Sequence, residues 1–487
     1  MLHRNTSDIH IPCPAACGEP CKTDRVSIER PLPRALPTDV GVDPAGVHAF
    51  LDGLARRRIA LHSLHLLRHG RIFAEATWAP YTQEHAPLLY SLSKTFCSAA
   101  VGIAVADGAF GYDDRLVDLF ADVVDEAGPV ASRMRVRDCL AMATGHTSDT
   151  VFTQHLAKLP GRQPWRSVLA VEPEGQPGAT FCYNQFATWT LAEVVRHATG
   201  RTVHEVLRDR VLGPLGITDS RWDTDANGRV LGFTGLHLPP EGIASFFQLL
   251  ADDGVRDGRR LLPPEWISGH RQKHVATDAS QTNPDWAQGY GWQVWLDTRG
   301  GYRGDGALGQ FGIVMPALDA VVVLTGLTAR MQEVLNELWS SLVPAFDRPG
   351  GGDAALAERL AHVALPTVGG ERGGSVYLSF ENRTNRWQLN DDPDGWILRW
   401  VDADGGDNRI PVGHGRWLDS EMTWGSRRLG VAASGAWVAW GHWVGHVITL
   451  DSPHGLLVHL RDDGSGRTEW IESAPLAGGS PADLASA

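Results

Sequence analysis

The chain has 487 residues, a formal net charge of −13, and apolar residues at 43% of its positions. One hydrophobic core rarely serves more than about 250 to 300 residues, so we expect two domains. The acidic balance, without a long basic run, disfavours nucleic acid and anionic membrane surfaces as partners. No stretch approaches the ~20 apolar residues of a membrane span, and residues 1–20 lack the apolar run of a signal peptide, so a cytoplasmic protein is expected.

Six cysteines in a chain of this length do not indicate a disulfide scaffold. Three of them lie in apolar patterns and are expected to be reduced core thiols: Cys97, Cys139 and Cys182. The other three, Cys13, Cys17 and Cys21, are spaced C-x3-C-x3-C among prolines and glycines, which differs from the paired C-x2-C spacing of zinc sites. We therefore expect a disordered leader over residues 1–36, with a metal or cluster site as the less favoured alternative.

A mixed α+β domain is expected over residues 37–350. Apolar periodicity, with caps such as Asp43-Pro44 and terminating glycines such as Gly108 and Gly200, predicts helices over 43–57, 91–107, 186–199 and 331–346. Alternating patterns predict a hairpin over 61–78 and strands over 289–296, 313–315 and 320–324. Helices and strands from both ends of this region must pack together, which is typical of an α+β fold.

A second domain is expected over residues 351–474. The glycine-rich segment Arg348-Pro349-Gly350-Gly351-Gly352 indicates the boundary. Beyond it, short β-rich runs recur between turn signals, at 376–380, 387–390, 396–401, 436–440, 446–450 and 456–460. This pattern predicts an all-β barrel or sandwich, followed by a disordered tail over residues 475–487.

Ser91-Leu92-Ser93-Lys94 fits the pattern S-x-x-K, in which a serine at a helix start faces a lysine one turn later. The chain has only four lysines and otherwise uses arginine for positive charge, which favours a role for Lys94 that requires loss of a proton. A lysine base needs a pKa lowered by about 3 units, and burial at a helix start lowers it through desolvation and the helix dipole. The alternative is an ordinary surface serine and lysine on one helix.

Four segments resemble one family in order and spacing. Residues 90–96 resemble the first motif of class C β-lactamases and of the related esterases, peptidases and aminohexanoate-oligomer hydrolases. Residues 136–146, 177–185 and 304–310 resemble three later segments of that family. The resemblance covers roughly residues 40–346 and implies a β-lactamase/transpeptidase-like domain, in which helices flank an antiparallel sheet.

The resemblance also implies an active site without a metal or organic cofactor. Ser91 would be the acyl-forming nucleophile and Lys94 its base, while Tyr183 would shuttle a proton between them and the leaving group. The backbone N–H groups of Ser91 and Ala307 would form the oxyanion hole. For Tyr183, a half-buried core tyrosine is the alternative.

Two departures from the family pattern concern substrate binding. Gln185 stands where the family has an asparagine that contacts a substrate amide. The third motif falls on Gly304, Asp305 and Gly306, with glycine where the family has a cation, so the usual partner of a β-lactam carboxylate is missing. Arg303 could replace that cation only if a bulge turned its side chain inward.

We therefore expect a serine hydrolase that cleaves a small-molecule ester or amide. A β-lactamase or D-amino-acid peptidase is the first alternative, and a non-catalytic ligand-binding protein is the second. The natural substrate, the role of the β domain and the oligomeric state stay open.

Overall fold

The computed structural model describes residues 28–121, 127–149, 169–225, 228–278, 281–373, 377–381, 385–401, 406–424 and 427–472. The expected tail over 475–487 and most of the expected leader, including Cys13, Cys17 and Cys21, lie outside the described residues. The leader prediction was wrong for residues 28–36, which pack on the first domain. Leu32 is buried, and its N–H donates to Glu241 Oε1 over 2.7 Å.

The helices have the following bounds: α1 Pro44–Arg56, α2 Ser93–Ala106, α3 Leu116–Leu119, α4 Val136–Leu140, α7 Gln185–Thr199, α8 Val203–Leu207, α9 Pro240–Ala251, α10 Pro264–His270, α11 Met331–Glu337 and α12 Asp353–Ala361. The strands of the first domain are β1 Ala60–Arg68, β2 Arg71–Thr77, β3 Arg221–Trp222, β4 Leu236–His237, β5 Val255–Arg256, β6 Arg259–Arg260, β7 Trp295–Leu296, β8 Tyr302–Gly306, β9 Gln310–Met315 and β10 Ala320–Leu327. Those of the second domain are β11 Tyr377–Glu381, β12 Arg386–Asp392, β13 Gly395–Val401, β14 Asp407–Gly413, β15 Leu418–Trp424, β16 Arg427–Ala439, β17 His442–Thr449, β18 Gly455–Arg461 and β19 Gly466–Ile471.

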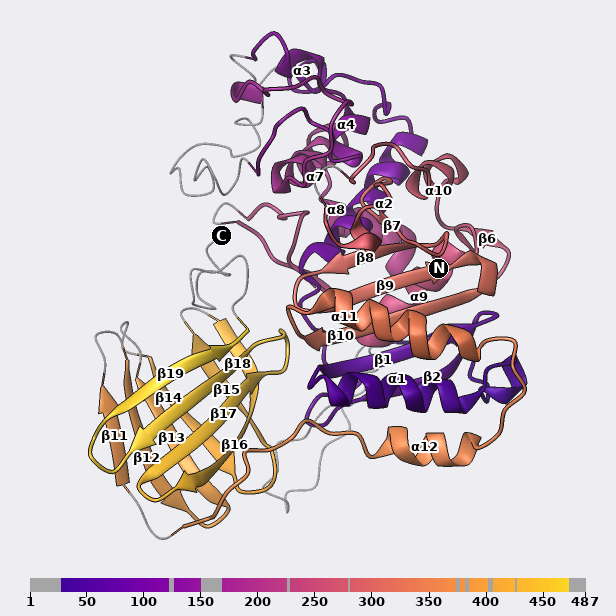
Figure 1. The fold of residues 1–487 in the computed structure, drawn as a ribbon. Helices are drawn as coiled ribbons and strands as arrows, with labels where there is room; N and C mark the ends of the chain where they lie inside the picture. The colour runs from indigo at the N-terminus through magenta and orange to yellow at the C-terminus, as the bar shows by residue number, and fades with distance from the viewer. Residues whose placement is uncertain are drawn as a thin grey trace, which may run out of the picture.

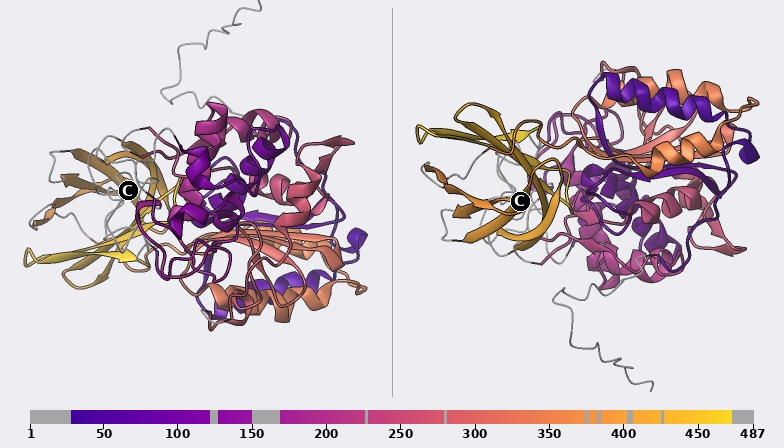
Figure 2. Two further views of the ribbon diagram at one scale, coloured as in Figure 1. Left: turned by 90° about the horizontal axis from the view of Figure 1, so that it is seen from above. Right: turned by 90° about the horizontal axis from the view of Figure 1, so that it is seen from below.

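A six-stranded antiparallel sheet, in the order β2-β1-β10-β9-β8-β7, forms the centre of the first domain. Strands from the two ends of the domain pair directly, with Leu64 of β1 opposite Leu324 of β10. Helices α1 and α11 cover one face of the sheet, and the larger helical region with α2 and α9 covers the other (Figures 1 and 2). The predicted α+β class is confirmed.

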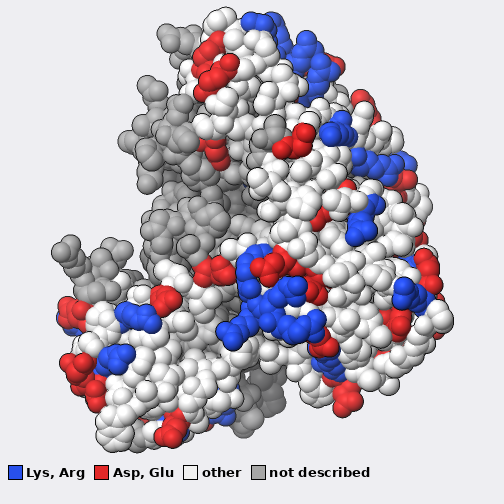
Figure 3. Space-filling view, in the orientation of Figure 1, with Lys and Arg blue, Asp and Glu red and all other residues white. Residues whose placement is uncertain are grey.

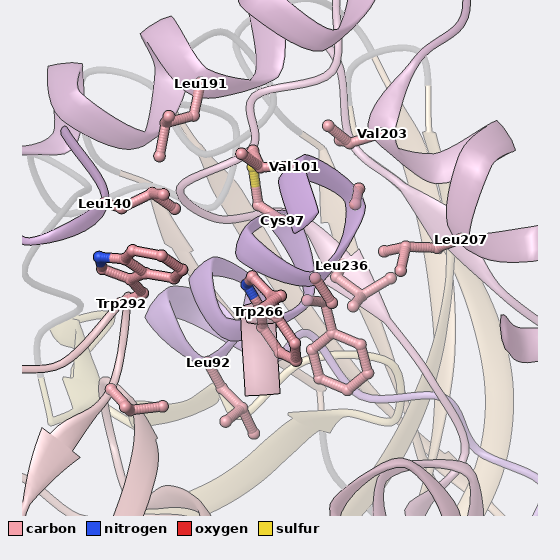
Figure 4. Packing of buried hydrophobic residues seen from close by; sticks show 14 of the residues in the cluster. Leu92, Cys97, Val101, Leu140, Leu191, Val203, Leu207, Leu236, Trp266 and Trp292 are labelled. Carbon is pink, nitrogen blue, oxygen red and sulfur yellow. The ribbon is translucent and has the colours of Figure 1, made fainter. Parts of the chain in front are cut away.

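Helix α2 is buried on nearly every side, as a helix with little polar surface must be. A Cβ on Gly102 would lie 2.3 Å from the Trp266 ring, so only glycine allows α2 and α10 to approach this closely. Figure 4 shows Trp266 beside α2, together with Leu92, Cys97 and Val101 of the same core. The start of α2, where the S-x-x-K pattern lies, is therefore held rigidly on several sides.

The second domain is a nine-stranded sheet that curves around its own hydrophobic core (Figure 1). Its neighbours are antiparallel except β14 and β16, which pair in parallel at one position. Trp396 and Trp443 are fully buried within it, and Trp387 stacks on Trp400. The predicted all-β domain is confirmed.

The first domain extends beyond the glycine-rich segment that the sequence indicated as the boundary. Helix α12 follows that segment and packs on the first domain, where Leu356 is buried in the core beneath α1 and β2. Arg359 Nη2 pairs with Asp52 Oδ1 over 2.7 Å, and Thr38 Oγ1 donates to Asp353 Oδ2 over 2.6 Å. The change from one domain to the other therefore lies after α12 rather than at residue 350.

Two predicted elements differ in the structure. The helix expected over 331–346 is α11 followed by a π turn over Leu338–Leu342 and a 3-10 turn over Val343–Ala345, because Pro344 has no N–H to continue an α-helix. Of the strand expected over 289–296, only β7 forms. Gly289 and Gln293 have φ of +119° and +61°, values outside the β region.

Among the described cysteines, Cys97 and Cys139 are buried free thiols and Cys182 is a half-buried free thiol. No helix in the described ranges is long and apolar enough to cross a bilayer. Despite the net charge of −13, Figure 3 shows basic as well as acidic side chains on both domains, with a group of basic side chains near the middle of this view.

The first prediction concerns α12. Leu356→Ala should lower the free energy of unfolding in urea by about 2 to 4 kcal/mol, because it leaves a cavity in the core of the first domain. Glu358→Ala, on the exposed side of the same helix, serves as the control and should change it by less than about 0.5 kcal/mol. Equal, small effects of both substitutions would show that α12 is a linker outside that core.

Candidate active site

Ser91 and Lys94 lie together where the chain enters α2. Ser91 is the middle residue of a 3-10 turn, Tyr90–Leu92, that leads directly into the helix. Lys94, in the first turn of α2, donates from Nζ to Ser91 Oγ over 2.8 Å and to the Phe233 carbonyl over 2.9 Å. The serine is half-buried and the lysine is only 1% exposed, so more of Ser91 than of Lys94 lies at the surface.

The surroundings of Lys94 favour its neutral amine. Burial lowers the pKa of Lys94 from 10.5 to about 7, although the Asp149 carboxylate opposes this shift. No carboxylate within the described ranges forms an ion pair with Lys94, and the positive end of α2 further disfavours an ammonium ion. Near neutral pH this amine can therefore accept a proton from Ser91.

Tyr183 completes the group of side chains around Ser91. Removal of the phenol from water raises the pKa of Tyr183, although the nearby Ser91 side chain opposes this shift. The centroid of its ring lies 4.9 Å from Lys94 Nζ, and the ring stacks on Trp295 at 5.7 Å between centroids. Tyr183 is therefore protonated near neutral pH. Its hydroxyl can donate this proton to one neighbour only while it accepts a proton from another.

The turn before α7 fixes the position of Tyr183. Asn184 caps α7 by accepting the N–H of Phe186 over 3.0 Å. On the other side, the Cys182 N–H donates to the Met142 carbonyl over 2.9 Å. Hydrogen bonds of the residues before and after Tyr183 thus hold this segment so that the tyrosine faces the start of α2.

Strand β8 brings Ala307 to the turn that carries Ser91. A Cβ on Gly306 would lie 2.1 Å from the Leu89 carbonyl oxygen, so only glycine lets β8 lie against this part of the chain. Ala307 follows directly and packs against the cluster of Leu88, Tyr90 and Leu308. Ala307 thus lies near the segment that leads into Ser91, and the oxyanion hole expected from the N–H groups of Ser91 and Ala307 stays a prediction.

Gly304 is a position of close packing between β8 and α2. A Cβ there would lie 2.5 Å from both Leu92 Cδ1 and Thr95 Oγ1, because β8 rests directly on α2. No cation can extend from this residue unless the helix moves. The structure therefore gives Gly304 a packing role, and its expected part in substrate binding stays a prediction.

The side chains of Arg303 and Asp305 lie on the face of β8 opposite to the one that Gly304 turns towards α2, because successive residues of a strand face opposite sides. The Arg303 guanidinium is fully buried, lies 4.6 Å from the centroid of the Trp286 ring and pairs with Asp305 at 3.0 Å between Nε and Oδ1. Burial raises the pKa of Asp305 to about 6 in spite of this pair. Arg303 Nε is thus engaged by a carboxylate, whereas its two Nη atoms have no hydrogen-bond partner among the described residues.

Gln185 is the first residue of α7 and lies beside Asp149. Its backbone N–H donates to Asp149 Oδ1 over 3.3 Å, and its side chain is 7% exposed. The side-chain oxygen of Gln185 has no hydrogen-bond partner among the described residues. Sequence reasoning missed Asp149 and the Phe233 carbonyl, since neither belongs to a recognisable motif and a backbone oxygen leaves no signature.

Comparison with known proteins gives a family. The model of the Beta-lactamase family matches residues 48–333. A 6-aminohexanoate-dimer hydrolase from Paenarthrobacter ureafaciens is 22% identical over 276 residues, which span 53% of this chain and 70% of that protein.

Two solved structures share the fold. EstCE1, a hydrolase with promiscuous acyltransferase activity, is 17% identical, with a TM-score of 0.52 over 61% of this chain and 99% of that one. A proposed 6-aminohexanoate-dimer hydrolase from Bacillus anthracis is also 17% identical, with a TM-score of 0.51 over 70% of this chain and 90% of that one. Since the family model covers more than half of the sequence, the chain belongs to the Beta-lactamase family and is a hydrolase of that family.

Proposed function

We propose that this protein cleaves an ester or amide bond through an acyl-enzyme formed on Ser91. The observation that carries the proposal is the buried Lys94 amine, without an ion pair in the described ranges, 2.8 Å from the Ser91 hydroxyl. A lysine in this state is a base adjacent to a nucleophile, which is the requirement for covalent catalysis. The relation to 6-aminohexanoate-dimer hydrolase supports a carbonyl substrate of this kind.

In the acylation step, Ser91 Oγ attacks the carbonyl carbon while its proton passes to Lys94 Nζ. The N–H groups of Ser91 and Ala307 stabilise the oxyanion of the tetrahedral intermediate. As the bond to the leaving group breaks, the proton on Lys94 reaches that group through the Tyr183 hydroxyl. The alcohol or amine departs and the acyl group remains on Ser91.

In the second step, water attacks the acyl carbon and loses a proton to the same Lys94–Tyr183 pair. Collapse of the second intermediate returns the proton to Ser91 Oγ and releases a carboxylic acid. Because Lys94, Tyr183 and Ser91 exchange one proton, the lysine and tyrosine titrate as a coupled pair. These three side chains, the substrate and one water molecule account for every bond and proton in the two steps.

The non-catalytic alternative is a protein that binds a ligand in the same place. Binding alone does not require a desolvated lysine, whose burial destabilises the folded state. Hydrolysis therefore accounts for the Ser91–Lys94–Tyr183 arrangement better than binding does. Among hydrolytic substrates, neutral esters and linear amides fit better than β-lactams, since nothing at position 304 can pair with a carboxylate.

A fluorophosphonate probe should label Ser91, because an activated serine reacts irrespective of its natural substrate. Peptide mapping of the adduct tests this prediction. Ser91→Ala should abolish labelling, whereas Ser93→Ala, two residues away and buried in α2, should retain it. An adduct on another residue, or none on the folded protein, would contradict the assignment of the nucleophile.

Lys94→Met should abolish labelling yet stabilise the fold, and the gain should be larger at pH 6 than at pH 9. In the wild type the lysine binds its proton more weakly when folded, with a pKa of about 7 instead of 10.5. The full penalty is therefore present below pH 7 and diminishes as the pH rises towards 10.5. Between pH 6 and 9 the gain should fall by roughly 2.5 to 3 kcal/mol, measured by urea unfolding.

The control for this experiment is Lys273→Met, at an exposed lysine, which should give no pH-dependent gain. If the two methionine variants showed the same pH dependence, the Lys94 amine would not be desolvated as described.

p-Nitrophenyl acetate or butyrate should be hydrolysed with a far higher kcat/KM than nitrocefin or penicillin G. Without a cation to contact the β-lactam carboxylate, the affinity for these substrates should be roughly 10- to 150-fold lower. Steady-state rates with both substrate classes test this. Equal kcat/KM values would contradict it, and loss of nitrocefin turnover in Arg303→Ala would then identify the cation.

A further inference from the structure

The β domain contacts the chain immediately before the nucleophile. The loop between β17 and β18 reaches the first domain, where the Leu88 N–H donates to the Asp451 carbonyl over 2.9 Å. At the end of the same loop, His454 Nε2 lies 2.7 Å from the Tyr90 hydroxyl and forms a hydrogen bond with it. Two residues of the segment that leads to Ser91 are thus held by a loop more than 360 positions away.

The hydrogen bond between Tyr90 and His454 is buried, and the loop that carries His454 makes a further contact with the first domain. Tyr90 is 0% and His454 is 4% exposed, so neither group can exchange its partner for bulk water. Burial lowers the pKa of His454 to about 4, so a neutral imidazole faces Tyr90 near pH 7. Arg221 of β3 holds the loop from the other side through an ion pair of 2.9 Å to the Asp451 carboxylate.

The backbone of Tyr90 has a conformation that other contacts must maintain. Its φ is +48°, in the left-handed region that L-residues other than glycine seldom adopt. Such conformations are energetically unfavourable and persist only where the surroundings impose them. Since Tyr90 directly precedes Ser91, its backbone angles determine where the Ser91 hydroxyl lies relative to Lys94.

We propose that His454 and Asp451 of the β domain are positioning residues of the hydrolase site, which hold the segment Leu88–Tyr90 and thereby Ser91 in the reactive arrangement. This inference rests on the function proposed above. Under this proposal, the β domain contributes to catalysis by holding the segment that carries the nucleophile. Displacement of a nucleophile by about 1 Å can cost on the order of 100-fold in rate, so the contact is large enough to matter.

The alternative is that these bonds only dock one domain on the other. The chain offers a matched control, because Tyr81 also donates its hydroxyl across the interface, to the Thr449 carbonyl over 3.1 Å. Tyr81 is likewise buried, but it is ten positions away from Ser91 and not next to the nucleophile. Docking predicts equal effects of Tyr90→Phe and Tyr81→Phe, whereas positioning predicts that they differ.

The experiment compares full-length variants by the rate of Ser91 phosphonylation and by the kcat and KM of ester hydrolysis. Tyr90→Phe and His454→Leu should lower the labelling rate and kcat by about 10- to 100-fold with KM changed less than about threefold. His454→Gln, which restores a hydrogen-bonding group, should recover part of that loss. Tyr81→Phe should stay within about twofold of the wild type in both quantities, even if it lowers the melting temperature as much.

Hydrogen exchange of the peptide 88–96 provides a readout that does not depend on chemistry. Faster exchange there in Tyr90→Phe than in Tyr81→Phe supports the inference. Equal exchange together with equal labelling rates in these two variants would overturn it and leave the proposed function intact. If wild-type Ser91 fails to react, the proposed function is wrong, and the exchange comparison still decides whether the β domain holds this segment.

Discussion

The desolvated Lys94 amine is the constraint on which the rest of the site depends. It lies at the start of a helix that is packed on nearly every side, and its hydrogen bonds go to the Ser91 hydroxyl and the Phe233 carbonyl. A pKa of about 7 instead of 10.5 corresponds to a penalty on the order of 5 kcal/mol for the ammonium form. The dense core around α2 must offset this penalty, so packing and chemistry are linked through one residue.

Close approach of strand and helix provides the remaining geometry. Gly304 and Gly306 have no side chains, and β8 can therefore lie against α2 and against the turn that carries Ser91. The same contact places Ala307 beside the nucleophile and removes the space for a cation at position 304. The proposed preference for substrates without a carboxylate thus has its origin in a packing requirement.

Much of the architecture could be predicted from local patterns. Asp43-Pro44 and Gly200 indicated helix ends within about one residue, and the S-x-x-K pattern placed Ser91 and Lys94 on one helical turn. Resemblance to a family supplied Tyr183 and Ala307, which no periodicity would have identified.

Apart from the helix and strand interrupted by local backbone features, the differences arise from contact between segments far apart in sequence. Glycines 350–352 resemble a linker, but Leu356 just beyond them is buried in the first domain. Gly304 was interpreted by its position in a motif, and the motif does not reveal its close packing against Leu92 and Thr95 of the neighbouring helix region. Likewise, no local pattern indicates that His454 meets Tyr90, because the partners belong to different domains.

The central claim is that a neutral Lys94 amine activates Ser91, and the pH dependence of Ser91 phosphonylation tests it most directly. The account predicts that the labelling rate rises about tenfold per pH unit below pH 7 and levels off above it, since the amine must lose its proton first. A rate that is independent of pH between 5 and 9, or that keeps rising towards pH 10 as for an ordinary lysine, would contradict the account.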